Sequence, residues 1–249
     1  MIHEETIQKL IGMKLHAMAA AVRELANAPP SKELNIEEVL GMLVDREHLH
    51  RDNRRLTRRL KEARLPPNAA CVEEVTCEPA RGLDKAVVRS LATCGWVRAK
   101  QNVIVVGATG TGKTFLATAL AQAACRAGFR ALSTRTSRLL HDLAVARGDG
   151  SYTAQLQRIA RAEVLVLDDF LLAPLKDQER RDLLEVLEDR YDRGSTVITT
   201  QVPTKTWHEA LGDPTVADAI CDRVIHNAHV VALRGPSQRK KKGVSTDQS

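Results

Sequence analysis

The residues with the clearest chemistry form one glycine-rich run. Gly107 is followed after four residues by Gly112, Lys113 and Thr114. Glycines let successive backbone N–H groups turn toward bound phosphate, the lysine neutralises phosphate oxygens, and the threonine hydroxyl reaches a magnesium ion. The run therefore predicts a phosphate-binding loop for ATP and Mg²⁺. The residues expected to contact the nucleotide are Gly107, Ala108, Thr109, Gly110, Thr111, Gly112, Lys113, Thr114 and Phe115.

The sequence on either side fits such a loop. An apolar run over residues 102–106 predicts a strand before it, and residues 115–126 have a helical pattern after it. The amino end of that helix carries partial positive charge, which favours bound phosphate. The alternative, an ordinary glycine-rich turn, would need neither the strand nor the helix.

Two adjacent carboxylates follow a second apolar run. Residues 164–167 predict a buried strand, and Asp168 and Asp169 come directly after it. A phosphate-binding loop needs a carboxylate of this kind nearby, because the magnesium ion that bridges the phosphates is held there. Asp168 is expected to hold Mg²⁺, directly or through water, and Asp169 to polarise the attacking water as a general base. Two solvated loop acids or a helix cap are the alternative.

A third strand also ends in polar side chains. Residues 196–200 are β-branched, and parallel sheets place ligand-contacting groups at the carboxyl ends of their strands. Thr200 or Gln201 is expected to orient the water. Alternatively, these threonines are present because β-branched residues suit a strand.

Arg223 lies on a predicted helix beyond these motifs, within residues 218–225. It can act as an arginine finger in a neighbouring subunit's site, a contribution of roughly 10³–10⁵ in rate where such a finger is known. The alternative is an ion pair with Asp218, Asp222 or another acid.

The elements that must position these residues change in kind along the chain. Apolar spacing predicts one helix over residues 3–26, and a second that opens within 31–36 and runs to about residue 64. After a connector, short strands alternate with helical patterns, which predicts an α/β fold with a parallel sheet covered by helices. The expected strands are 103–106, 131–134, 164–167, 196–200 and 230–233. The expected divisions are a helical domain over 1–65, a connector over 66–100, a nucleotide-binding core over 101–235 and a basic, disordered tail over 236–249.

Composition limits the classes of protein that remain. The chain has 249 residues, of which 43% are hydrophobic and 27% charged, as in ordinary globular proteins. Neither a signal peptide nor an apolar run of membrane-spanning length is present, so we expect a cytoplasmic protein with no membrane partner. The five cysteines are scattered without metal-ligand spacing, which indicates reduced thiols. The net charge of +6 permits a nucleic-acid partner.

Much of that positive charge lies in the second predicted helix. Between residues 46 and 64, basic residues outnumber acidic ones and an apolar stripe remains on one face. The sequence contains only 3% aromatic residues for base stacking, so we expect sequence-tolerant contact with the phosphates of double-stranded DNA. A salt-bridged surface helix, or one that docks an acidic partner, is the alternative. The predicted DNA-binding residues are Arg51, Arg54, Arg55, Arg58, Arg59 and Lys61.

Three segments together resemble a known family. The segments are DREHLHRDNRRLTRRLKEARLP at 45–66, LVLDD at 165–169 and DAICDRVIHNAHVVALRGPSQRK at 218–240, with the phosphate-binding loop between the first two. They resemble the IstB-type transposition helper ATPases, which are AAA+ relatives of DnaC-type helicase loaders. The resemblance implies an AAA+ core, magnesium-dependent hydrolysis of ATP to ADP and phosphate, self-assembly with ATP around DNA, and delivery of a cognate transposase to target DNA.

The resemblance also implies residue roles. By it, Lys113 and Thr114 contact phosphate and magnesium, Asp168 and Asp169 form the Walker B pair, and Thr200 lies at the sensor 1 position. Arg223 matches the arginine finger, and Arg239 lies where a sensor 2 arginine is found.

Two departures from the wider AAA+ pattern bear on these roles. Walker B reads Asp-Asp where Asp-Glu is usual, which shortens the expected base by one methylene. Few residues follow the last predicted strand, so we expect no C-terminal helical lid, and Arg239 must act from a short tail, unless that tail only aids solubility.

Three other functions remain open. A DnaC-type helicase loader shares the ATPase core, and a small-molecule kinase shares the phosphate-binding loop. A scaffold that binds ATP without turnover is the third. A GTPase is disfavoured because the chain contains no NKxD motif.

Overall fold

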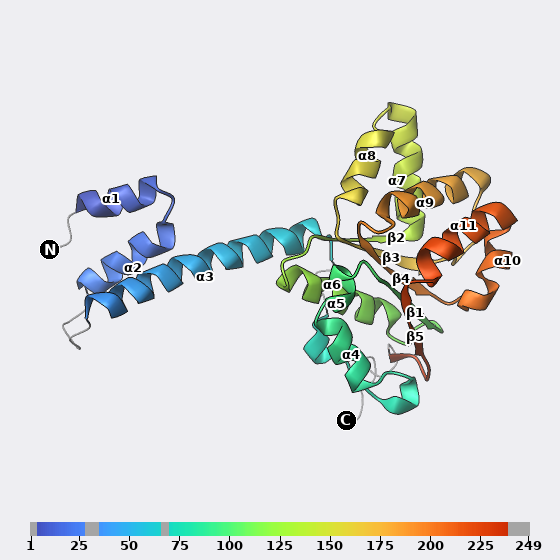
Figure 1. Ribbon diagram of the computed structural model, residues 1–249, viewed down its shortest axis with the longest axis horizontal. Helices are drawn as coiled ribbons and strands as arrows, with labels where there is room; N and C mark the ends of the chain where they lie inside the picture. Colours follow the sequence, from blue (N-terminus) through green and yellow to red (C-terminus); the bar gives the residue numbers. More distant parts are fainter. Residues whose placement is uncertain (1–3, 28–34, 66–69, 239–249) are drawn as a thin grey trace, which may run out of the picture. The chain divides into compact units, whose positions relative to one another are not determined.

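The computed structural model describes residues 4–27, 35–65 and 70–238 (Figure 1). The chain forms two compact units, Met1–Arg58 and Arg59–Ser249, and the division falls within a long helix. In chain order the elements are α1 (Glu4–Gly12), α2 (His16–Asn27), α3 (Ile36–Glu62), η1 (Val72–Glu74), η2 (Pro79–Arg81), α4 (Lys85–Ala92), α5 (Gly95–Arg98), β1 (Asn102–Gly107), α6 (Lys113–Arg126), β2 (Ala131–Arg135), α7 (Thr136–Asp149), α8 (Tyr152–Ala160), β3 (Val164–Phe170), α9 (Asp177–Arg190), β4 (Ser195–Thr200), η3 (Thr204–Thr206), α10 (Trp207–Leu211), α11 (Pro214–Ile225) and β5 (Ala228–Leu233).

The first unit is helical, as expected, but the prediction of one helix over residues 3–26 is wrong. Lys14 adopts a left-handed conformation with φ of 61°. The N–H of Lys14 donates to the carbonyl of Ile11, and the N–H of Leu15 donates to the carbonyl of Leu10. These paired bonds close the end of α1 as a Schellman motif, which satisfies its last carbonyls and lets the chain turn into α2.

The third helix begins at a capping box. Asn35 Oδ1 accepts from the N–H of Glu38, and a carboxylate oxygen of Glu38 accepts from the N–H of Asn35. This reciprocal pair satisfies two backbone donors that a helix start leaves open. The predicted opening within residues 31–36 is therefore correct for its described residues 35 and 36.

The second unit is built on a five-stranded sheet in the order β2-β3-β4-β1-β5. Every adjacent pair of strands is parallel. Each predicted strand is present, extended by one or a few residues at its ends. Val103, Ile104 and Val105 of β1 and the apolar residues of β3 are buried, as expected for strands covered on both faces. The predicted α/β class with a parallel sheet is confirmed.

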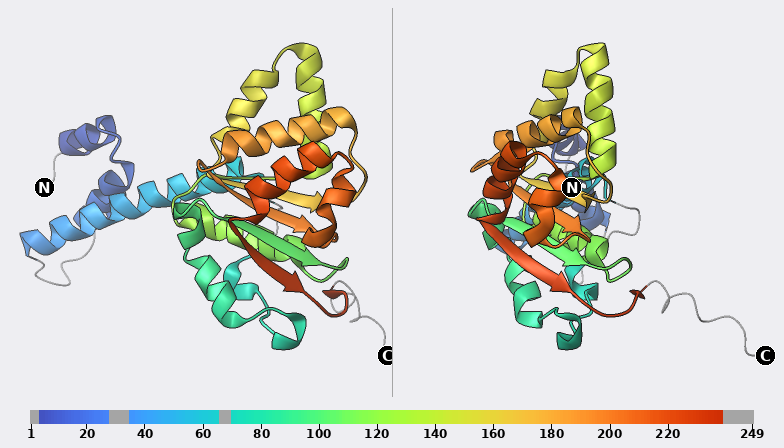
Figure 2. Two further views of the ribbon diagram at one scale, coloured as in Figure 1. Left: turned by 45° about the vertical axis from the view of Figure 1, so that its right-hand side comes forward. Right: turned by 90° about the vertical axis from the view of Figure 1, so that its right-hand side faces the viewer.

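Helices cover both faces of this sheet (Figure 2). The segment expected as a connector is not a plain linker, because α4 and α5 lie within the second unit. Trp96 is 3% exposed, donates from Nε1 to the carbonyl of Leu91, and offers its own carbonyl to Ser195 Oγ at the start of β4. An indole buried with its N–H satisfied fixes this segment against the sheet.

Further expectations concern smaller features. All five cysteines are free thiols, and Cys94, Cys125 and Cys221 are buried. In the described part of the chain, none of the helices has the length and apolar character needed to cross a membrane. Among the described residues only 234–238 follow β5, so no helical lid is seen there.

Candidate nucleotide-binding site

The glycine-rich run forms a loop between β1 and α6, at the carboxyl edge of the sheet. Gly110 and Gly112 have φ of +83° and +97°, a region that L side chains rarely adopt. At Gly107, an added Cβ would lie 2.7 Å from the carbonyl oxygen of Leu233. All three positions therefore require glycine, two for backbone conformation and one for the close approach of β5. The predicted strand, loop and helix order is confirmed.

A cavity of about 560 Å³ opens over this loop. Its polar wall comes from the loop and from the first turn of α6, whose N–H groups and helix dipole favour an anion. Its other wall is partly apolar and includes Ala70, Val75, Leu83 and Leu233. The expected contact residues that line it are Thr109, Gly110, Thr111, Gly112, Lys113, Thr114 and Phe115. A polar end joined to an apolar end suits a phosphate ester that carries a flat base.

Gly107 and Ala108 are not lining residues, and they meet Lys113 through their carbonyls. Lys113 is 7% exposed, and its Nζ donates to the carbonyl of Gly107 at 2.8 Å and to that of Ala108 at 2.9 Å. Burial of an ammonium requires such partners. The lysine charge therefore lies at the base of the loop, where it can serve phosphate oxygens.

Asp168 and Thr114 meet beside the loop. Thr114 Oγ1 lies 2.9 and 3.2 Å from the two carboxylate oxygens of Asp168. The carboxylate is 8% exposed and also accepts a hydrogen bond from the hydroxyl of Thr199. A hydroxyl and a carboxylate are the hard oxygen ligands that Mg²⁺ prefers, and Mg²⁺ needs few protein ligands when phosphates supply the rest. These side chains fit a magnesium ion.

Asp169 occupies a distorted end of β3. The pairing of β3 with β4 shifts between Leu167 and Phe170, and Asp169 has φ of 56°. Its N–H donates to Thr199 Oγ1 at 3.0 Å, and its side chain lines the cavity. Bulges of this kind re-aim side chains next to active sites, and a non-glycine residue at positive φ is often a functional one. Asp169 therefore lines the nucleotide cavity, whereas its strand neighbours Asp168 and Phe170 do not.

The expectation for Thr200 does not fit its position. Thr200 is 0% exposed, donates to the carbonyl of Phe170 and accepts from the N–H of Val202. It does not line the cavity. Gln201 does, and it accepts a hydrogen bond from Thr109 Oγ1 at 2.9 Å. Of the two water-orienting alternatives, the structure therefore favours Gln201, while Thr199, which the sequence did not single out, connects Asp168 with Asp169.

Arg223 lies at the opposite edge of the sheet. Asn102, the first residue of β1, donates from Nδ2 to the carbonyls of Arg223 and Val224. The loop follows the last residue of β1, so the length of that strand, about 17 Å at ~3.3 Å per residue, separates the two sites. Arg223 pairs with Glu188 and donates to the carbonyl of Ala219. An ion pair, the alternative to an arginine finger, is thus present, and its acid is Glu188 and not Asp218 or Asp222.

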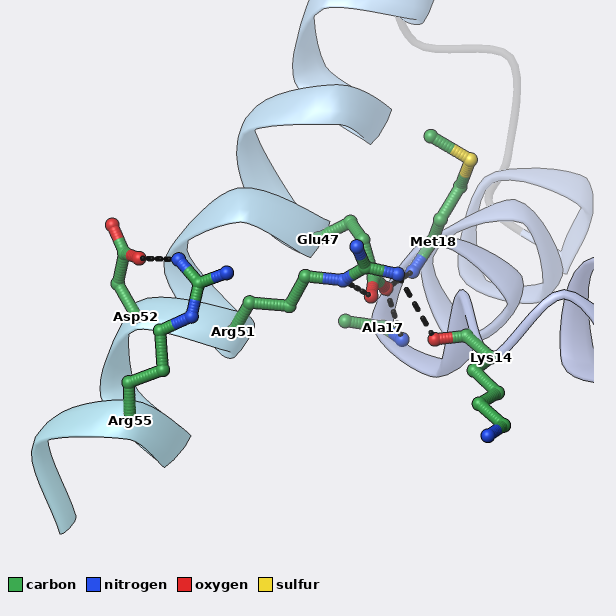
Figure 3. A network of polar contacts seen from close by, with 7 residues as sticks. All are labelled: Lys14, Ala17, Met18, Glu47, Arg51, Asp52 and Arg55. Carbon is green, nitrogen blue, oxygen red and sulfur yellow. Dashed lines mark hydrogen bonds and ion pairs between the residues drawn. The ribbon is translucent and has the colours of Figure 1, made fainter. Parts of the chain in front are cut away.

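The basic residues of α3 have different environments. Arg51 pairs with Glu47 and donates to the carbonyl of Lys14, and Arg55 pairs with Asp52 (Figure 3). Arg54 is exposed and has no ion pair among the described residues. Arg51 is therefore part of a structural network, as in the salt-bridged alternative, and its contact with DNA stays a prediction. Arg58 belongs to the first unit, and Arg59 and Lys61 belong to the second.

Glu47 is the centre of that network. It is 6% exposed, and one of its oxygens accepts from the N–H groups of Ala17 and Met18, which start α2 (Figure 3). Burial alone would raise the pKa of Glu47, but the hydrogen bonds from Met18, Arg51 and Ala17 outweigh it and hold the pKa below its ordinary value. A sequence pattern gives no signal for this contact, since the partners are about thirty residues apart.

The tail reaches the loop. The N–H of Gln238 donates to the carbonyl of Gly110 at 2.8 Å, and Gln238 lines the cavity. Arg239, the expected sensor 2 residue, lies outside the described residues. The lining residues of 70–83 were not predicted, since the sequence there has neither a motif nor a helical or strand period. In the tail the resemblance indicated Arg239 and not Gln238.

A glycine-rich loop between β1 and a helix, with an acid-bearing strand β3 separated from β1 by β4, defines a P-loop nucleotide-binding domain. Solved structures with this fold include the DnaC helicase loader, with a TM-score of 0.56 and 22% identity over 68% of this chain and 98% of that one. AMPPCP-bound DnaA from Aquifex aeolicus has a TM-score of 0.58 and 16% identity, covering 72% of this chain and 54% of that one. The fold of this chain is therefore the one that these structures share.

The family follows from sequence. The model of IstB-like ATP binding proteins matches residues 8–246, and the chain belongs to this family. The insertion sequence ATP-binding protein y4pL of Sinorhizobium fredii is 46% identical, over 96% of this chain and 98% of its own length. The insertion sequence IS21 ATP-binding protein of Pseudomonas aeruginosa is 35% identical, over 92% of this chain and 86% of its own length. The expected family is confirmed.

Proposed function

We propose that the chain is an ATP-dependent, DNA-binding and self-assembling regulator that helps a transposase in DNA transposition. It selects or remodels target DNA and hydrolyses ATP to ADP and phosphate with Mg²⁺. The observation that carries the catalytic part is the pair of Thr114 and Asp168 beside the amino end of α6. Family membership and the relatives named for insertion sequences support the rest. Such a role places the protein in the cytoplasm, with the DNA.

Each residue at the cavity has its own role in the proposed hydrolysis of ATP. Loop N–H groups and Lys113 hold the phosphates, and Thr114 and Asp168 would hold Mg²⁺, which neutralises charge that develops on the phosphate oxygens when bound. Asp169 faces the cavity and accepts a proton from the attacking water, while Gln201 orients that water. The water oxygen bonds to the γ-phosphorus while the bond between that phosphorus and the bridging β–γ oxygen breaks. The products are inorganic phosphate and ADP.

Arg223 acts in a neighbouring subunit's site. It lies at the amino edge of the sheet, a strand's length from the loop of its own chain, and cannot serve that loop. Release from Glu188 would free the guanidinium for phosphate oxygens of the neighbour. Mixing Arg223→Ala with Lys113→Ala tests this: where the loop of an Arg223→Ala subunit meets the finger of a Lys113→Ala subunit, both are intact, so part of the activity should reappear. Normal hydrolysis by Arg223→Ala alone would contradict it, and so would a mixture that assembles but shows no activity.

The assembly is tested by coupling hydrolysis to DNA. We expect phosphate release per subunit to rise with duplex DNA and with protein concentration, since both bring loops and fingers together. A DNA-indifferent monomer that transfers phosphate to a metabolite would instead be a kinase, and assembly without turnover would indicate a scaffold. Stimulation by a hexameric helicase, and not by the cognate transposase, would indicate a helicase loader.

A further inference from the structure

Arg81 is a buried arginine at the meeting point of three segments of the second unit. It ends η2, in the stretch before β1 that no motif covers, and it is 8% exposed. Its side chain lines the nucleotide cavity together with Thr76 and Thr111. A long cationic side chain is rarely buried this far unless its hydrogen bonds hold something in place.

The shorter of the two hydrogen bonds that the Arg81 side chain donates is to the phosphate-binding loop. Nη2 of Arg81 donates to the carbonyl of Thr111 at 2.7 Å, and both atoms are buried. For the loop to present N–H groups to phosphate, its carbonyls must point away, and each needs a donor there. Thr111 directly precedes Gly112, whose φ of +97° turns the chain into α6. A charged donor at this carbonyl therefore fixes the residue before the turn.

The other bonds of Arg81 anchor it on both sides. Nη1 donates to the carbonyl of Thr76 at 3.4 Å, and the backbone carbonyl of Arg81 accepts from the N–H of Arg234, just after β5. The next residue, Gly82, packs so closely on β5 that an added Cβ would lie 2.3 Å from the carbonyl oxygen of Ala232. The backbone of Arg81 is thus held against the end of β5, and its guanidinium donates to the loop.

The arrangement is not optimal for stability alone. Nε of Arg81 is buried and has no hydrogen-bond partner among the described residues. A buried unsatisfied donor costs free energy, and such groups in native proteins call for an explanation beyond packing. By contrast, Arg190 is 2% exposed, lies away from the cavity, and uses Nε, Nη1 and Nη2 in hydrogen bonds.

We propose that Arg81 is a positioning residue for the phosphate-binding loop, which rests on the proposed assignment of the cavity to ATP. It acts through the Thr111 carbonyl: by holding that oxygen outward, it keeps the N–H groups that follow turned toward the phosphates. The bond from Arg234 to Arg81 makes this geometry depend on the segment after β5, which continues to Gln238 at the cavity.

Three variants test the role by titration with a fluorescent ATP analogue and by thermal unfolding without nucleotide. Arg81→Met keeps the length of the side chain and removes its donors, so we expect ATP affinity to fall roughly 10-fold to 100-fold. Arg81→Lys restores a charge and one donor group but cannot span the Thr76 and Thr111 carbonyls together, so its affinity should be intermediate. The control is Arg180→Met, because Arg180 also donates to two carbonyls, those of Leu175 and Leu211, and does not line the cavity.

Arg180→Met should lower the unfolding temperature and leave ATP affinity within about twofold, which separates loss of stability from loss of positioning. Undiminished ATP affinity in folded Arg81→Met would overturn the role of Arg81 while the proposed function stands. If Arg81→Met does not fold, wild-type affinity in Arg81→Lys would overturn it equally. A wild-type chain that binds no ATP would overturn the proposed function, and the role of Arg81 with it.

Discussion

The two units differ in what their buried charged side chains do. In the second unit the sheet has an extensive apolar core, and Lys113 and Asp168 lie at its carboxyl edge, where they line or adjoin a cavity. In the first unit the buried apolar cluster is small, built on Ile7, Ala19 and Val22, and the buried Glu47 ties two helices together. Where an extensive apolar core holds the fold, buried charges such as Lys113 and Asp168 are available for chemistry, although Arg190 of the same unit has only structural contacts. Where that core is small, charge helps to hold the fold.

Among the buried charges of the second unit, loss of Lys113 should have the largest effect on ATP binding. Lys113→Ala removes a buried ammonium from the base of the loop, so we expect ATP affinity to fall at least ~100-fold, and ATP-dependent assembly with it. The fold should persist, because the sheet core does not depend on this charge. Nucleotide titration measures the affinity and thermal unfolding measures the fold. Lys205→Ala, outside the cavity in η3, is the control, and equal affinity in both variants would contradict the prediction.

The next effect concerns hydrolysis alone. Asp169→Asn keeps the size of the side chain and removes the proposed base, so turnover should fall roughly 10²–10⁴-fold while ATP binding stays near wild type. Asp192→Asn is a matched control, since Asp192 also lies at positive φ, 54° against 56°, but outside this cavity. Phosphate release measures the turnover, and nucleotide titration measures the ATP affinity. Normal turnover in Asp169→Asn would remove this residue from the base role.

The second unit could be predicted further from sequence than the first. A motif such as the loop specifies its residues by spacing, and strands buried on both faces appear as continuous apolar runs. The same property explains the misplaced Thr200. In a fully buried strand, alternation does not show which side chain faces the site, and the shift at Asp169 changes the register further.

In the first unit the decisive contacts are long-range or conformational. The break after Gly12 depends on Lys14 adopting a left-handed conformation, which a lysine does not signal, and on Glu47 capping a helix about thirty residues away. Arg51 and Arg54 look equivalent in the sequence of α3, yet only Arg51 has an acid and a carbonyl within reach. The lining of the cavity by residues 70–83 was missed for a similar reason, because its contacts come from irregular backbone.

Loss of Glu47 tests the other half of the comparison, with a smaller effect. Glu47→Gln should destabilise the first unit by about 1–2 kcal/mol, the usual contribution of a helix cap and a charged hydrogen bond. Amide hydrogen exchange in α2 of the full chain measures it, and ATP affinity should not change. Glu24→Gln, which removes an exposed partner of Arg46, is the control, with about 0.5 kcal/mol or less.

The same carboxylate predicts a dependence on pH. The folded-state pKa of Glu47 is lowered, so its stabilisation is present above the ordinary glutamate pKa of about 4.3 and is lost as the pH falls through the folded value. Protection of the α2 amides should therefore fall below about pH 4 in the wild type, and less in Glu47→Gln. Equal pH profiles for the two proteins would contradict the assignment.

The smallest effect separates two arginines of one helix. Arg54 is exposed with no ion pair among the described residues, whereas Arg51 holds Glu47 and the Lys14 carbonyl. If α3 contacts DNA phosphates, Arg54→Gln should reduce the slope of log affinity against log salt by about one unit and leave α2 protection unchanged. Arg51→Gln should do the reverse, weakening α2 protection with a smaller change of slope. Equal slopes for both variants and the wild type would place DNA contact elsewhere, and a full unit lost in Arg51→Gln would mean that the network opens when DNA binds.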